Sequence, residues 1–263
     1  MKYITEWVIG FKYKYDPGNH MKKLLICVVL AVSTNATAQQ TIEFVVTASS
    51  GGPNDLVTRA VDDKIKKHTS LKTIVVHKPG AAQTIGRNYV QQSSNPILVL
   101  DTSQIQDHGV YHELDEIFTL GNFTNLLFVS RASGLKGLDQ LIALSKQRDI
   151  KFGHGGQGTF SYMAMEALCS ARISCLEVPY KSGAQGMQAL MSQEIDAYAI
   201  VSYGSQPFLQ NTRIVAIHEI KMPDRKGWFT LFSKNVSEKD RHLIRAVLEK
   251  QSARFYKDLG FIK

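Results

Sequence analysis

The sequence predicts an α/β protein built from two domains that face each other. Short β-rich runs alternate with helical patterns along the chain, which favours parallel sheets with helices on both faces. Each half contains a glycine-rich turn between a strand and a helix. The 263 residues are enough for two small cores, and the 44% hydrophobic and 21% charged content is ordinary for a folded chain.

Turns rich in glycine, proline and polar residues separate the elements of the first half. In chain order we expect a strand at 41–47, a helix at 55–67, a strand at 72–77, a helix at 84–92 and a strand at 96–100. Pro53 suits the start of the first helix, and Asn54 or Asp55 is expected to cap it.

The second half continues the alternation. Strands are expected at 118–122, 126–130, 150–153, 175–178, 197–202, 213–218 and 228–232. Helices are expected at 138–146, 160–170, 186–192 and 237–250, with a short one near the end of the chain. Ser237 with Asp240 predicts the start of the helix at 237–250.

The first 38 residues have the features of a secretory signal. Met21-Lys22-Lys23 precedes nine apolar residues from Leu24 to Val32, and Ala36-Thr37-Ala38 has the small-x-small form of a signal-peptidase site. We therefore expect residues 1–20 to be an upstream extension, the signal peptide to run from Met21 to Ala38, and the mature protein to be exported. An uncleaved membrane anchor is the alternative, although the apolar run is short for a spanning helix.

The formal net charge is +8, but residues 1–38, with five Lys and two acidic residues, supply +3 of it. The remaining excess is spread along the chain without a basic run or interleaved aromatic residues. This distribution argues against a nucleic-acid surface and weakly favours an anionic small molecule.

Two cysteines remain after cleavage, Cys169 and Cys175. An even number in an exported chain permits one disulfide, and two buried free thiols are the alternative. Neither the CxxC spacing nor the His/Cys spacing of a metal site occurs, so we expect no metal and no cofactor.

Three turns at strand ends are candidates for anion binding. The first, Ala48–Asp55, and the second, Gly153–Ser161, each lead from a strand into a helix, whose N-terminus offers unpaired N–H groups to a carboxylate or phosphate. The second turn has four glycines within six residues and adds the hydroxyls of Thr159 and Ser161. Ordinary strand-to-helix turns are the alternative for both.

His154, in the second turn, could act as a base, although polar lining is the more common role of a lone loop histidine. The third turn, Val178–Gln185, ends another strand. There Tyr180 could form a wall for a ligand and Lys181 could supply positive charge, unless the turn is simply solvated. No G-x-S-x-G elbow, HExxH motif or carboxylate pair occurs, so we expect no catalytic residues and no enzyme activity.

Taken in order, several stretches resemble the substrate-binding proteins of tripartite tricarboxylate transporters, the Bug family. They are GGPNDLVTRAV at 51–61, VVHKPGAAQTIGRNYV at 75–90, IKFGHGGQGTFSYMAMEAL at 150–168, EVPYKSGAQGMQALMSQEIDA at 177–197, RIVAI at 213–217 and GWFTLF at 227–232. No single stretch is decisive, but the ordered set is specific and covers nearly all of the expected mature chain.

The resemblance implies a two-lobed periplasmic-binding-protein fold of type II, the Venus flytrap. Lobe 1 would comprise 39–122 plus 219–263, and lobe 2 would comprise 123–218. Such a protein captures a small organic acid, a carboxylate, in the cleft between its lobes and delivers it to membrane permease subunits. We therefore expect a periplasmic monomer that binds no nucleic acid.

The first two turns hold the ligand carboxylate in that family, and two further strand-end segments face the cleft. Carried over together with the candidates named above, the expected ligand-binding residues are Ser49, Ser50, Gly51, Asn54, Asp55, Thr102, Ser103, His154, Gly156, Gly158, Thr159, Ser161, Tyr180, Tyr203 and Ser205.

The chain also departs from the family pattern. The segments Asp101–Phe118 and Ile220–Trp228 are short, and His154 and Gln157 stand where small polar residues are common. An exported sensor or scaffold protein of the same fold, without transport, is therefore the alternative, followed by an exported α/β enzyme.

Overall fold

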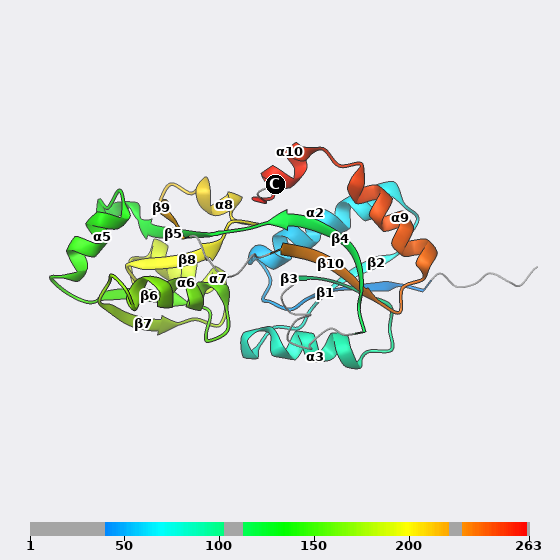
Figure 1. The fold of residues 1–263 in the computed structure, drawn as a ribbon, viewed down its shortest axis with the longest axis horizontal. Helices are drawn as coiled ribbons and strands as arrows, with labels where there is room; N and C mark the ends of the chain where they lie inside the picture. The colour runs from blue at the N-terminus through cyan, green and yellow to red at the C-terminus, as the bar shows by residue number, and fades with distance from the viewer. Residues whose placement is uncertain (1–39, 103–112, 221–227, 262–263) are drawn as a thin grey trace, which may run out of the picture. The chain divides into compact units, whose positions relative to one another are not determined.

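The structure is a computed structural model that describes residues 40–102, 113–220 and 228–261 (Figure 1). The expected signal peptide, Met21–Ala38, and the expected ligand residue Ser103 lie outside these ranges. Within them, no helix combines the length and the apolar character needed to cross a membrane.

The described strands form two five-stranded sheets. The first sheet has the order β2-β1-β3-β10-β4 and the second has the order β7-β6-β8-β5-β9. The strands of the first sheet are β1 (Ile42–Val46), β2 (Thr73–His77), β3 (Ile97–Thr102), β4 (Asp115–Asn122) and β10 (Trp228–Lys234). Those of the second are β5 (Asn125–Ser130), β6 (Ile150–His154), β7 (Cys175–Pro179), β8 (Ala197–Val201) and β9 (Ile214–Ile220).

Each sheet contains one reversed strand, so both sheets are mixed, whereas the alternation of strands and helices favoured parallel sheets. In the first sheet β10 runs antiparallel to β3 and β4, and in the second β5 runs antiparallel to β8 and β9. Both reversed strands are the ones that the chain enters from the other sheet. Strand β4 ends at Asn122 and β5 begins at Asn125, so the chain passes directly from the first sheet into the second.

Helices cover both faces of each sheet, as expected (Figure 1). In the first sheet, Phe44 packs with Val57 and Val61 of α2 (Pro53–His68), while its neighbour Val45 packs with Val90 of α3 (Thr84–Gln92) on the other face. This alternation is the two-residue period of a strand. Helices α9 (Glu238–Glu249) and α10 (Ala253–Asp258) complete the α2 side.

The second sheet follows the same rule. Leu127 packs with residues of α5 (Leu138–Ser145) and α6 (Phe160–Cys169), and Phe128 packs with residues of α7 (Gly183–Met191). The short α8 (Gln206–Leu209) lies beside β9, and the 3-10 turns η2 (Ala81–Gln83) and η3 (Arg131–Ser133) precede α3 and follow β5.

A disulfide joins Cys169, the last residue of α6, to Cys175, the first residue of β7, with an S–S distance of 2.00 Å. In the structure these thiols are therefore bonded rather than free. The bond closes a loop of five residues at the end of α6 where the helix leaves the sheet.

Two expected helix starts have different outcomes. Ser237 accepts a hydrogen bond from the Asp240 N–H at 3.1 Å, which confirms the predicted start of α9. Helix α2 begins at Pro53, with Gly52 at the N-cap and no side-chain cap, so the predicted cap by Asn54 or Asp55 is wrong. Both side chains accept hydrogen bonds from other groups instead, Asn54 from Tyr203 and Asp55 from the Gly51 N–H.

Candidate functional site

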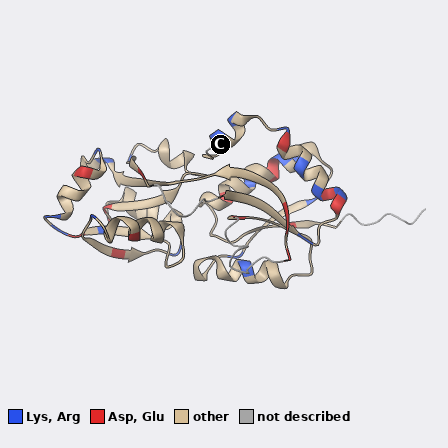
Figure 2. Cartoon of the chain, in the orientation of Figure 1, with Lys and Arg blue, Asp and Glu red and all other residues tan. Residues whose placement is uncertain are grey.

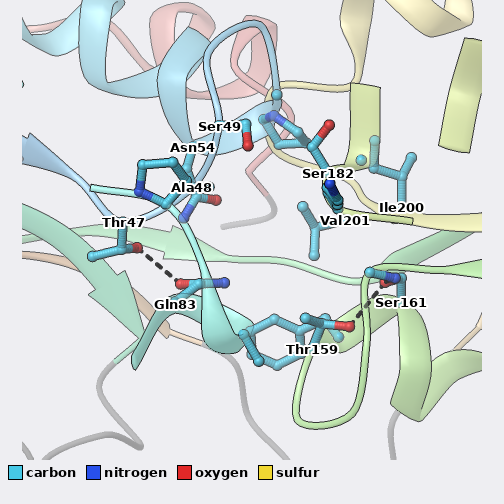
Figure 3. Close-up of a pocket in the computed structure, with 18 of the residues that line it drawn as sticks. Thr47, Ala48, Ser49, Asn54, Gln83, Thr159, Ser161, Ser182, Ile200 and Val201 are labelled. Carbon is cyan, nitrogen blue, oxygen red and sulfur yellow. Dashed lines mark hydrogen bonds between the residues drawn. The ribbon is translucent and has the colours of Figure 1, made fainter. Parts of the chain in front are cut away.

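A cavity of about 450 Å³ lies at the strand ends of both sheets (Figure 3). Residues after β1, β2, β6 and β7 line it, together with most of β8. The described lining residues are Thr47, Ala48, Ser49, Gly52, Pro53, Asn54, Pro79, Gly80, Ala81, Ala82, Gln83, Gly155, Thr159, Phe160, Ser161, Lys181, Ser182, Gly183, Tyr198, Ala199, Ile200, Val201 and Tyr203.

The N-termini of α2, α3, α6 and α7 all reach this cavity. Helices α2 and α3 have no side-chain cap, so no N-cap side chain accepts a hydrogen bond from their first N–H groups. Helices α6 and α7 are capped by Thr159 and Ser182, whose hydroxyls accept from the N–H groups of Tyr162 and Gln185. Each helix N-terminus carries a partial positive charge, so the four together favour an anion in the cavity.

The charge of the lining agrees with this electrostatic field. Among the described residues the lining includes Lys181 and no Asp or Glu. Elsewhere the surface is mixed: basic and acidic residues are interleaved along α9 (Figure 2).

Asp55 fixes the first turn from behind the cavity wall. Its buried carboxylate accepts from the Gly51 N–H at 2.8 Å and the Ser50 hydroxyl at 3.2 Å, and it pairs with His77 at 2.8 Å and Arg59 at 2.9 Å. Burial alone raises the pKa of Asp55, but these donors outweigh it, and the pKa lies below its usual value. Asp55 therefore stays ionised and holds the turn in shape.

Asn54 and Tyr203 join the two sides of the cavity wall. The Tyr203 hydroxyl donates to Asn54 Oδ1 at 2.9 Å, and its ring stacks on Phe229 at a centroid distance of 4.2 Å. Burial raises the pKa of Tyr203, so the phenol remains a neutral donor.

The segment from Ala81 to Gln83 has an unusual backbone. Ala81, Ala82 and Gln83 have φ values of 46°, 49° and 77°, which lie in the left-handed region that favours glycine. Such conformations cost on the order of 1–3 kcal/mol per residue and collect at functional sites. The Gln83 Oε1 atom accepts from the Thr47 hydroxyl at 2.9 Å, which ties this segment to the end of β1 (Figure 3).

The second turn supplies two linked hydroxyls. Thr159 Oγ1 and Ser161 Oγ lie 3.0 Å apart, Thr159 donates to the Gly156 carbonyl at 2.7 Å, and Ser161 accepts from the Gly155 N–H at 2.9 Å (Figure 3). Positive φ values at Gly156 (97°) and Gly158 (82°) allow the tight course of this turn.

Of the expected ligand residues, the structure brings Ser49, Asn54, Thr159, Ser161 and Tyr203 together in the cavity lining. Others support the lining without belonging to it. They are Ser50, Gly51 and Asp55 in the first turn and His154, Gly156 and Gly158 in the second.

His154 is such a support. It is buried, and its Nδ1 atom accepts from the Gly156 N–H at 3.0 Å. Burial lowers its pKa although the nearby Glu177 works in the opposite direction, so the ring is neutral at pH 7. His154 lies outside the described cavity lining, so the structure does not place it where a base would meet a ligand.

Three more expected residues also lie outside the lining. Thr102 is buried, with its N–H bound to Asp101 Oδ1 at 2.8 Å, and Ser205 is buried and donates to the Ser202 carbonyl at 2.6 Å. The Tyr180 hydroxyl turns to Glu194 at 3.1 Å. A sequence pattern locates the strand ends but not which way each side chain points.

Sequence reasoning did not select Thr47, Gln83, Ser182 or the β8 residues Tyr198 to Val201. Ser182 could have been found as an N-cap before a helix. Gln83 carried no signal, because nothing in the sequence shows that its backbone is left-handed.

Residues 57–230 match the family described as the tripartite tricarboxylate transporter family receptor. This chain belongs to that family. A UPF0065 protein of Cupriavidus necator is 25% identical over an alignment of 174 residues that covers 61% of this chain. The match spans about half, 53%, of that relative's length.

Solved structures of other proteins share this fold. An R. palustris protein determined with adipate has a TM-score of 0.73 at 15% identity, with 85% of this chain and 89% of that chain covered. MatC from Rhodopseudomonas palustris, with bound malate, has a TM-score of 0.67 at 18% identity, with 85% and 90% covered. The two-sheet α/β architecture of this receptor-family chain is therefore that of periplasmic binding proteins.

Proposed function

We propose that this protein is a periplasmic solute-binding protein that captures a small organic acid in the cavity and delivers it to the membrane subunits of a tripartite transporter. The convergence of four helix N-termini on one cavity carries the proposal, because this arrangement favours a carboxylate. Family membership supports it, as do the adipate and malate bound by two proteins of similar fold.

Several finer assignments belong to the same proposal. The two sheets would be the two lobes, divided near residues 122 and 218, and the segment Met21–Ala38 would direct export. The candidate ligand residues act in two groups. Lining residues such as Ser49, Thr159 and Ser161 contact the acid, and supporting residues such as Asp55 hold the turns that present N–H groups. Binding needs no chemical step, so no turnover of the acid is expected.

The test is a thermal-shift screen of the protein from residue 39 onward with dicarboxylates, tricarboxylates, amino acids and aromatic acids, followed by calorimetry. An acid at a hundred times its dissociation constant should stabilise the fold by about 2.7 kcal/mol. A folded protein that no carboxylate stabilises would contradict the proposal. Chemical analysis of the recovered acid should show it unchanged.

A further inference from the structure

We propose that the side-chain amide of Gln83 is a recognition group for the bound acid, donating a hydrogen bond from Nε2 to a ligand oxygen. The inference rests on the proposed function and adds to it a specific side chain that selects the ligand. Gln83 lines the cavity, as the residue before α3.

Neighbouring residues determine which way the amide faces. The Thr47 hydroxyl donates to Gln83 Oε1 at 2.9 Å, and Arg87 Nη2 lies 3.5 Å from the same oxygen. A guanidinium can only donate, so the amide atom that faces Arg87 is the oxygen and not the nitrogen. The orientation of the amide therefore follows from chemistry.

Arg87 is itself held in place. Its Nε and Nη2 atoms bind the two oxygens of the buried Asp101 at 3.1 Å and 3.3 Å. A fork of this kind fixes the guanidinium plane, and with it the side of Gln83 that carries the oxygen. The chain of contacts from Asp101 through Arg87 to Gln83 makes the amide a prearranged group.

The nitrogen of the amide then faces the open part of the cavity. Figure 3 shows it pointing away from Thr47, toward the side where Thr159 and Ser161 lie. A primary amide nitrogen is a donor with no acceptor capacity, so it pairs with a carboxylate, carbonyl or hydroxyl oxygen of a ligand and not with an ammonium group.

The backbone supports the assignment. Gln83 adopts a φ of 77°, in the region where glycine would fit without strain, yet the position carries a long polar side chain that reaches the cavity. Gln193 has a similar φ of 63° but lies in an exposed turn outside the described lining. It therefore provides a matched control.

The experiment uses Gln83→Met, which removes the donor nitrogen and adds no charge to the cavity. Gln193→Met makes the same chemical change at an exposed residue of similar φ away from the cavity. Calorimetry measures the affinities of the wild type and both variants for malate, succinate and adipate, and thermal unfolding without ligand measures stability.

We expect Gln83→Met to unfold within a few degrees of the wild type and to bind the best of these acids at least tenfold more weakly, whereas Gln193→Met changes affinity less than twofold. If Gln83→Met fails to fold, Gln83→Gly, which fits a φ of 77° without strain, decides by the same tenfold criterion. A smaller loss overturns the assignment to Gln83. If the wild type binds none of the three acids, nor any in the wider screen, the proposed function itself fails and this inference fails with it.

Discussion

Single residues decide the shape of the first turn. Asp55 is buried among four donors, and the turn that it holds places the α2 N-terminus at the cavity. Gly204 has a similar role. A Cβ added there would lie 2.6 Å from the Pro53 Cα, so the chain can pass the start of α2 only without a side chain. The wall of the cavity is thus positioned by residues that do not face it.

Asp55→Asn should destabilise the protein in a pH-dependent way. The pKa of Asp55 is lower in the folded protein than in the unfolded chain, so its ionised form stabilises the fold at neutral pH, and this contribution fades as the pH falls below about 4. We expect a loss of about 1–3 kcal/mol at pH 7 and a smaller loss at pH 3, measured by urea unfolding.

The control for this prediction is Asp258→Asn, which changes a carboxylate whose side chain is 67% exposed. Its effect should stay within about 0.5 kcal/mol at both pH values. Equal losses for Asp55→Asn at pH 7 and pH 3 would show that the charge of Asp55 plays no part in holding the turn.

At the scale of the elements, the sequence pattern located nearly every helix and strand. The helix expected at 84–92 is found there as α3, because its apolar spacing and flanking turns are both local signals. The reversed strands β5 and β10 could not be predicted in the same way, because their direction depends on how the chain passes between the sheets. Likewise, the pattern identified the first two turns that line the cavity but not Gln83, whose position depends on contacts with Thr47 and Arg87.

Thr159→Val should weaken both stability and binding. The change removes the α6 cap and the hydroxyl that lies beside Ser161 in the cavity. We expect a loss of about 1 kcal/mol in unfolding free energy. We also expect a loss of roughly tenfold in affinity for the best acid, because the Thr159 hydroxyl donates to the Gly156 carbonyl and so holds the turn that presents Ser161 to the cavity. Denaturant unfolding and calorimetry measure the two effects.

Ser237→Ala is the matched control, since it removes a cap of the same kind from α9, outside the described lining. It should cost a similar amount of stability and leave the affinity unchanged. A Thr159→Val variant that keeps wild-type affinity would remove the second turn from the binding site.

The disulfide should stabilise the second sheet without affecting the ligand. Cys169 and Cys175 are six residues apart, and a loop this short corresponds to about 2 kcal/mol of chain entropy. We expect the double variant Cys169→Ala, Cys175→Ala to lose about that much stability in urea and to bind the acid as before, because neither residue lies in the described lining. A loss of affinity larger than twofold would indicate that the end of α6 is coupled to the cavity.

At the scale of the whole molecule, both sheets contribute to one cavity, so a ligand that contacts both should bring their strand ends together. We expect the radius of gyration, measured by small-angle X-ray scattering, to fall when the best acid saturates the protein. The Gln83→Met variant provides the control, at an acid concentration that saturates the wild type and leaves the variant unsaturated. An unchanged radius at saturation would mean that the cavity is preformed.

The reversed strand β10 has a consequence for biogenesis. It lies between β3 and β4 and comes from residues 228–234, so the first sheet lacks a middle strand until almost the whole chain has been synthesised. The second sheet is built from contiguous residues, 125–220, and its pairings can all form earlier. During synthesis, the first sheet must therefore wait in an incomplete state for a strand that emerges late, so the sheet whose strands are made first is completed last.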